Sequence, residues 1–129
     1  GHSTSKHIEM DRMFVVIKPN AAKLYGDNIR THLVGNGFEI VREKVVHFNE
    51  IIYQNLSLDC SGQNIDAAVK YLASDQIIVM ILEKVNGYED IIDIVGHRDP
   101  SYARNQQLDS IRAIYGKNVI ENAIEVSLN

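Results

Sequence analysis

The sequence has little of what cross-linked, metal-bound or membrane-embedded folds are built from. It contains one cysteine, Cys60, no tryptophan and two prolines in 129 residues. A single cysteine excludes an internal disulfide framework and a cysteine-based zinc cluster, which suits a reducing compartment. The longest aliphatic run, residues 77–82, has six members, whereas a membrane span needs roughly 18. The sequence therefore predicts no membrane partner.

An excess of positive charge is also missing. Thirteen Lys and Arg residues stand against 17 Asp and Glu residues, which gives a net charge of −4. This balance argues against a nucleic-acid partner, since such binding depends on neutralising phosphates. Apolar residues make up 45% of the chain and charged residues 23%, as in ordinary globular domains. A chain of this length fits one domain.

The two ends of the chain differ in character from the middle. Residues 1–10 begin with a polar, aperiodic stretch, which we interpret as a tag or disordered leader. Residues 11–129 are then predicted to form one domain. The sequence stops abruptly at Leu128-Asn129, which leaves open that this domain is a segment of a longer protein.

Short apolar runs alternate with amphipathic stretches along this domain. Strands are predicted where β-branched residues gather, and helices where apolar residues recur every three or four positions. The predicted strands are residues 13–17, 38–48 with a bulge, 76–82 and 119–126. The predicted helices are residues 20–35, 65–72, 88–95 and 108–115, with a polar loop over 97–107. This order predicts a ferredoxin-like α+β domain with a four-stranded antiparallel sheet and helices on one face.

Taken residue by residue, the sequence offers few chemical groups in a recognisable arrangement. It has no Gly-rich phosphate loop, no Ser-His-Asp set and no His/Asp/Glu cluster with metal-ligand spacing. Lys18, Arg98 and Arg112 are cations suited to a phosphate. An equally simple interpretation makes Lys18 a solvated strand end and the two arginines partners of the many acids.

Several short strings resemble, in order, motifs of the nucleoside diphosphate kinase family. Residues 15–21, V-V-I-K-P-N-A, resemble I-K-P-D-A, and residues 96–100, G-H-R-D-P, resemble G-x-T-N-P. Residues 110–116, S-I-R-A-I-Y-G, resemble S-L-R-A-L-F-G of a divergent, cilium-associated branch. Residues 122–127, N-A-I-E-V-S, resemble N-A-V-H-G-S. The resemblance covers residues 12–127 and implies the ferredoxin-like fold as well.

The resemblance also implies roles for individual residues. Family members pass the γ-phosphate of one nucleotide to another nucleoside diphosphate through a phosphohistidine. Lys18 and Arg112 match the family's phosphate-binding lysine and one of its phosphate-binding arginines, and Asn122 matches the asparagine that contacts the ribose. Glu125 stands where the nucleophilic histidine is expected. A Mg-nucleotide such as ATP or GDP is the implied ligand if binding is retained.

Further departures from the family pattern surround Glu125. Ile92 stands at the second phosphate-binding arginine and Val126 at the glycine after the nucleophile. Arg98 replaces a threonine and can supply part of the lost positive charge. The stacking phenylalanine and the active-site tyrosine fall in a part of the chain without a clear match, near Asn64 and near Leu56, Ser57 or Tyr53.

Two hypotheses follow for the function. A carboxylate at Glu125 repels a γ-phosphate by roughly 4 kcal/mol at about 4 Å and an effective dielectric near 20, and it can pair with Lys18 or Arg112 instead. The first hypothesis is a catalytically inactive domain in the cytoplasm that acts as an interaction or assembly module, through protein partners or self-association. A cilium or flagellum as its setting is implied by the branch resemblance alone. The alternative is a divergent phosphotransfer or nucleotide-binding protein whose clamp consists of Lys18, Arg98, Arg112 and Asn122.

Overall fold

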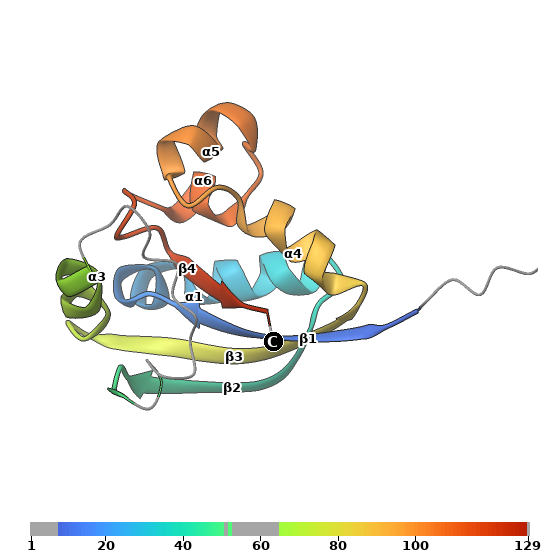
Figure 1. The fold of residues 1–129 in the computed structure, drawn as a ribbon, viewed down its shortest axis with the longest axis horizontal. Coiled ribbons are helices and arrows are strands. Elements are labelled where there is room, and N and C mark those ends of the chain that lie inside the picture. Colours follow the sequence, from blue (N-terminus) through green and yellow to red (C-terminus); the bar gives the residue numbers. More distant parts are fainter. Residues whose placement is uncertain (1–7, 51, 53–64, 129) are drawn as a thin grey trace, which may run out of the picture.

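A computed structural model describes residues 8–50, 52 and 65–128. Strands and helices alternate along most of this chain, with three helices in succession before the last strand (Figure 1). The elements are β1 (Met10–Ile17), α1 (Pro19–Gly35), β2 (Glu39–His47), α3 (Ile65–Leu72), β3 (Gln76–Val85), α4 (Gly87–Val95), α5 (Pro100–Gln106), α6 (Ile111–Tyr115) and β4 (Ile124–Ser127).

The described strands form one antiparallel sheet in the order β2-β3-β1-β4. β1 lies inside the sheet, where Ile17 pairs with Ile78 of β3 on one side and Ile124 of β4 on the other. The register between β2 and β3 shifts between Ile40 and Arg42, which confirms the predicted bulge. The predicted ferredoxin-like α+β fold is therefore confirmed, and it brings the end of β1 beside the last strand.

Alternation along β1 divides the apolar side chains between two clusters. Val15 and Ile17 belong to the larger cluster, which α1, α4 and α6 cover on one face of the sheet (Figure 1). Val16 points to the opposite face, where it packs with Leu72 of α3 and Ile77 of β3. The helices therefore do not all lie on one face of the sheet, whereas the sequence predicted that they would. Burial of β1 on both faces explains why its sequence is a continuous apolar run rather than an alternating one.

Three of the predictions need correction in the last third of the chain. Residues 97–107 are not an irregular loop, because they contain α5. The side chain of Asp99 caps the first turn of this helix by accepting a hydrogen bond from Ser101 N at 2.9 Å. The strand predicted over residues 119–126 is only β4, since residues 117–121 form a turn in which Lys117 N donates to Glu121 O at 2.8 Å. The helix predicted over residues 108–115 begins at Ile111.

A glycine joins α4 to the segment that follows it. Gly96 has a φ of +85°, and a Cβ built on it would lie 2.3 Å from Ser110 Oγ. That hydroxyl caps α6 by accepting from Ala113 N at 3.2 Å. Any side chain at position 96 therefore strains the backbone and displaces the cap of α6.

We expect Gly96→Ala to lower the free energy of unfolding by at least about 2 kcal/mol, because positive φ and the clash both disfavour alanine. Chemical denaturation followed by circular dichroism measures the change. Gly35→Ala is the matched control, since a Cβ there meets nothing within 4 Å and alanine favours the helix by about 1 kcal/mol at most. Equal effects of the two substitutions would contradict the role assigned to Gly96.

Candidate functional site

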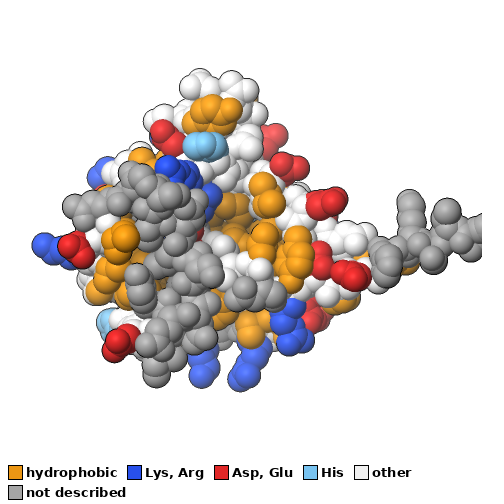
Figure 2. All heavy atoms as spheres, in the orientation of Figure 1, with side chains coloured by type: hydrophobic (Ala, Val, Ile, Leu, Met, Phe, Trp, Pro, Cys, Tyr) orange, Lys and Arg blue, Asp and Glu red, His pale blue; other side chains and the backbone are white. Residues whose placement is uncertain are grey.

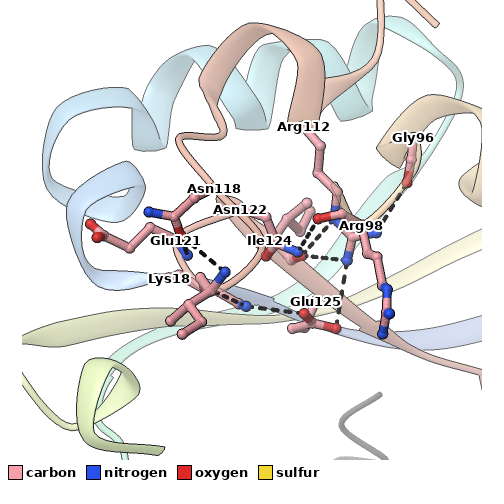
Figure 3. Close-up of polar contacts among 10 residues, drawn as sticks. Lys18, Gly96, Arg98, Arg112, Asn118, Glu121, Asn122, Ile124 and Glu125 are labelled. Carbon is pink, nitrogen blue, oxygen red and sulfur yellow. Dashed lines mark hydrogen bonds and ion pairs between the residues drawn. The ribbon is translucent and has the colours of Figure 1, made fainter. Parts of the chain in front are cut away.

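The five residues singled out from the sequence come from separate segments that meet at one end of β4 (Figure 3). Lys18 lies between β1 and α1, Arg98 between α4 and α5, and Arg112 in α6. Asn122 precedes β4, and Glu125 is its second residue. The short β1–α1 junction and the pairing of β1 with β4 bring Lys18 to the same place as Glu125.

Lys18 is held by both its backbone and its side chain. Its backbone N donates to Ala123 O at 2.8 Å, and its Nζ donates to Ile120 O at 3.0 Å. The side chain is only 5% exposed. Ala123 has a φ of +78°, a conformation that costs a residue with a side chain about 1–3 kcal/mol. The turn before β4 is thus built around Lys18.

Arg112 connects β4 to the segment after α4. Its Nε and Nη2 both donate to Ile124 O, at 3.2 Å and 2.8 Å. Its Nη1 donates to Gly96 O at 3.0 Å. The guanidinium is therefore fixed in a buried position by backbone acceptors on two sides.

Glu125 lies between these two cations. Its Oε1 is 3.0 Å from Lys18 Nζ, and its Oε2 is 3.5 Å from Arg112 Nη2. All three side chains are about nine-tenths buried. The sequence predicted a pair with Lys18 or with Arg112, and the structure contains both. We call this arrangement of Lys18, Glu125 and Arg112 the charge triad.

Asn122 and Arg98 meet beside the charge triad. Asn122 Nδ2 donates to the backbone carbonyl of Arg98 at 2.9 Å. Asn122 is fully buried, and its Oδ1 has no hydrogen-bond partner among the described residues. Buried acceptors are rarely left in this state, and a hydroxyl or amide of a ligand would reach this oxygen only if the atoms that cover it moved aside.

A pocket of about 200 Å³ opens between α4 and β4 beside the charge triad. Figure 2 shows hydrophobic side chains gathered on this face of the molecule. Arg112 and Glu125 of the charge triad lie in the wall of the pocket together with Arg98, and the rest of the wall is mainly aliphatic. The lining residues are Ile91, Ile92, Val95, Gly96, Arg98, Arg112, Glu125, Val126 and Leu128.

The arrangement of these elements can be compared with known proteins. A sequence model of the family described as "Nucleoside diphosphate kinase" matches residues 11–128. The chain belongs to this family. A probable nucleoside diphosphate kinase 5 from Arabidopsis thaliana is 32% identical over 114 residues, which cover 87% of this chain and 79% of the relative.

Solved structures of this family share the fold. The nucleoside diphosphate kinase of Halobacterium salinarum, in complex with CDP, matches with a TM-score of 0.75 and 25% identity, covering 94% of this chain and 78% of the other. The Aquifex aeolicus nucleoside diphosphate kinase matches with a TM-score of 0.76 and 24% identity, covering 92% and 86% of the two chains.

Other relatives are much longer than this chain. A thioredoxin domain-containing protein 3 homolog from Heliocidaris crassispina is 30% identical over 115 residues, which are 88% of this chain and 14% of the relative. A thioredoxin domain-containing protein 6 from Xenopus laevis is 26% identical over 121 residues, or 93% and 19%. The chain spans less than a fifth of the length of these relatives.

The structure extends the set of site residues that the sequence suggested. The carbonyls of Gly96, Ile120 and Ile124 accept hydrogen bonds from Lys18 and Arg112. Sequence analysis could not find them, because every residue has a backbone carbonyl. Buried Ile91 and Val95 line the pocket, and the helical spacing of α4 had placed them only on its apolar face.

Some of the residues considered at the sequence level cannot be placed. The positions weighed for the stacking aromatic and the tyrosine lie outside the described residues: Tyr53, Leu56, Ser57 and Asn64. Within the described ranges, no three His, Cys, Asp or Glu side chains converge on a possible metal position. None of the described helices is both long and apolar enough to cross a membrane.

We expect Glu125→Gln to lower the free energy of unfolding by about 3 kcal/mol, because removing one partner leaves two buried cations facing a neutral amide. Urea denaturation gives this value. Glu83→Gln is the matched control, since the Arg12 that Glu83 pairs with at 2.7 Å is 65% exposed and such pairs contribute about 1 kcal/mol or less. A loss no larger than that of the control would show that the charge triad does not stabilise the fold.

Proposed function

We propose that this chain is a nucleoside diphosphate kinase-like domain that has lost phosphoryl transfer and serves as an interaction or assembly module. In this proposal Glu125 stands at the position of the nucleophilic histidine. Nucleotide binding, if it remains, is weak. The proposal also assigns the chain to the divergent, cilium-associated branch, on the resemblance of residues 110–116.

The observation that carries this proposal is the charge triad. Phosphoryl transfer needs a nucleophile in line with the phosphorus and cations that are free to take up charge on the equatorial oxygens. Here Lys18 and Arg112 both face the carboxylate of Glu125, at 3.0 Å and 3.5 Å. A γ-phosphate would have to displace that carboxylate, which lines the adjoining pocket. The carboxylate thus takes the place of the substrate's negative charge.

The residues around the charge triad support the same interpretation. Ile92, at the position of a phosphate-binding arginine, and Val126, at the position of a glycine, both line the pocket. Their aliphatic side chains offer no hydrogen bond to a phosphate, and Val126 adds bulk beside Glu125. Arg98 lines the same pocket and supplies part of the positive charge that Ile92 does not carry.

The alternative is a divergent phosphotransfer or nucleotide-binding protein, and one observation favours it. Asn122 Oδ1 is buried without a partner among the described residues, which suits the ribose hydroxyl that the family resemblance assigns to Asn122. The Halobacterium salinarum relative was solved with CDP. In this alternative Lys18, Arg98, Arg112 and Asn122 hold a Mg-nucleotide, and Glu125 must release its cations first.

The proposal includes a cellular setting and partners. The branch resemblance supports a cytoplasmic chain within a cilium or flagellum. The great length of the thioredoxin-named relatives supports a domain that works as part of a larger assembly, with protein partners or further copies of itself.

We expect no nucleoside diphosphate kinase turnover from this chain, because Glu125 carries no imidazole and engages both cations. Incubation with γ-labelled ATP, followed by alkaline and acid treatment, should leave no base-stable, acid-labile phosphate on the protein. Labelled phosphohistidine at any position, His97 included, would contradict the proposal.

A series of variants provides the positive control for that experiment. Glu125→His restores a nucleophile alone, and we expect little or no label, because catalytic groups that act together are strongly non-additive. Val126→Gly and then Ile92→Arg, added in turn, should raise the label stepwise. Strong labelling of the single variant would mean that the phosphate clamp is largely intact, which favours the alternative.

We also expect weak nucleotide binding, about tenfold to a hundredfold weaker than that of the Aquifex aeolicus relative under the same conditions. The reason is the loss of one arginine and of base stacking, which alone contributes about 1–3 kcal/mol in nucleic-acid sites. Calorimetric titration with Mg-ATP and Mg-GDP measures the affinity. Micromolar or tighter binding would contradict this expectation, and its loss in Asn122→Ala would assign the binding to the alternative clamp.

A further inference from the structure

The pocket between α4 and β4 has a chemical character that a polyphosphate does not match. Ile91 and Val95 form its buried wall, and Ile92, Val126 and Leu128 extend that wall outward. Five of its nine lining residues are therefore aliphatic. A surface of this kind gains free energy when it removes apolar groups of a ligand from water, and a triphosphate has no such groups at this end.

The charged groups around the same pocket leave an excess of positive charge. The single carboxylate of Glu125 faces both Lys18 and Arg112, at 3.0 Å and 3.5 Å. Arg98 is half-buried and adds a further cation to the lining. This excess favours a ligand that carries a negative charge beside its apolar group.

We propose that this pocket binds a protein segment in which an aliphatic side chain stands next to a carboxylate. The aliphatic side chain fills the space between Ile92 and Val126, and the carboxylate lies against Arg98. The inference rests on the proposed function, because it assigns a protein partner to a site that, in that proposal, no longer serves a nucleotide.

The size and the rim of the pocket favour a segment of a protein over a small molecule. A volume of about 200 Å³ accommodates one or two aliphatic side chains. Ile92 is 59% exposed and Leu128 42% exposed, so the apolar surface continues beyond the pocket onto the outside of α4 and the end of β4. A small carboxylic acid would leave that rim in water, whereas a neighbouring stretch of polypeptide covers it, in the manner of an anchor residue seated in a pocket.

The test uses the full chain and a fluorescein-labelled, blocked hexapeptide, Ser-Glu-Ile-Leu-Glu-Ser, followed by fluorescence anisotropy. Two matched peptides have glutamine in place of both glutamates, or serine in place of isoleucine and leucine. We expect saturable binding of the first peptide and at least about tenfold weaker binding of each of the others, as a charge-assisted hydrogen bond or a buried anchor predicts.

Variants of the chain locate the binding. Ile92→Asp should weaken it at least about tenfold, because the new carboxylate repels the peptide and removes an apolar wall. Ile114→Asp is the matched control, since Ile114 is 51% exposed, does not line this pocket, and should leave the affinity unchanged. Arg98→Gln should reduce the preference for glutamate over glutamine in the peptide. Circular dichroism confirms that each variant is folded.

Several results would overturn the inference. The first is that no peptide binds at millimolar concentration, and the second is that the glutamine peptide binds as tightly as the glutamate peptide. The third is that Ile92→Asp and Ile114→Asp weaken binding equally. The fourth is that 4-methylpentanoate binds as tightly as the peptide, which would make the ligand a small carboxylic acid. Mg-ATP that displaces the peptide at micromolar concentration would overturn the proposed function instead. Failure of the peptide to bind, with ATP also failing to bind, would overturn this inference alone.

Discussion

The part of the fold that joins β1, α6 and β4 depends on one buried carboxylate between two buried cations. Moving an isolated ion into a protein interior costs several kcal/mol even after relaxation, so none of the three side chains of the charge triad is stable there alone. Lys18 and Arg112 receive further compensation from the carbonyls of Ile120, Ile124 and Gly96. Because these carbonyls belong to the segment after α4, the turn before β4 and the first residue of β4, the charge triad also fixes the backbone around the pocket.

Much of the fold could be predicted because the buried positions of its strands and helices carry apolar residues, which the sequence shows directly. The β-branched runs of β1 and β3 are buried on both faces, and Pro19 marks the first turn of α1. α5 could not be predicted, because only Pro100 and Ala103 of its seven residues are buried. Its stability comes instead from the Asp99 cap and from Arg104, whose Nη1 donates to the carbonyls of Ala113 and Gly116.

The sequence predicted which residues belong to the candidate site, but it did not predict the hydrogen bonds and ion pairs that they form. The strings around Lys18, Arg112 and Glu125 identify side chains that belong together, but residue types do not say how many partners one carboxylate has. The strand expected over residues 119–126 shows the same limit. Val119 and Ile120 have the composition of a strand, yet residues 117–121 form a turn and Ala123 has a positive φ. In this geometry the carbonyls of Ile120 and Ala123 accept from Lys18. Such backbone geometry depends on the tertiary contact it serves.

The presence of Lys18 and Arg112 has a structural explanation that does not involve a nucleotide. Each neutralises Glu125 and holds turns of the backbone, so replacing either would leave buried polar groups unpaired. A binding site that loses its substrate is expected to lose cations whose only partner was that substrate, because two unpaired buried cations destabilise a fold. The carboxylate of Glu125 removes that penalty. The presence of Lys18 and Arg112 is therefore weak evidence for nucleotide binding, and Asn122 Oδ1, which has no hydrogen-bond partner among the described residues, is the stronger evidence.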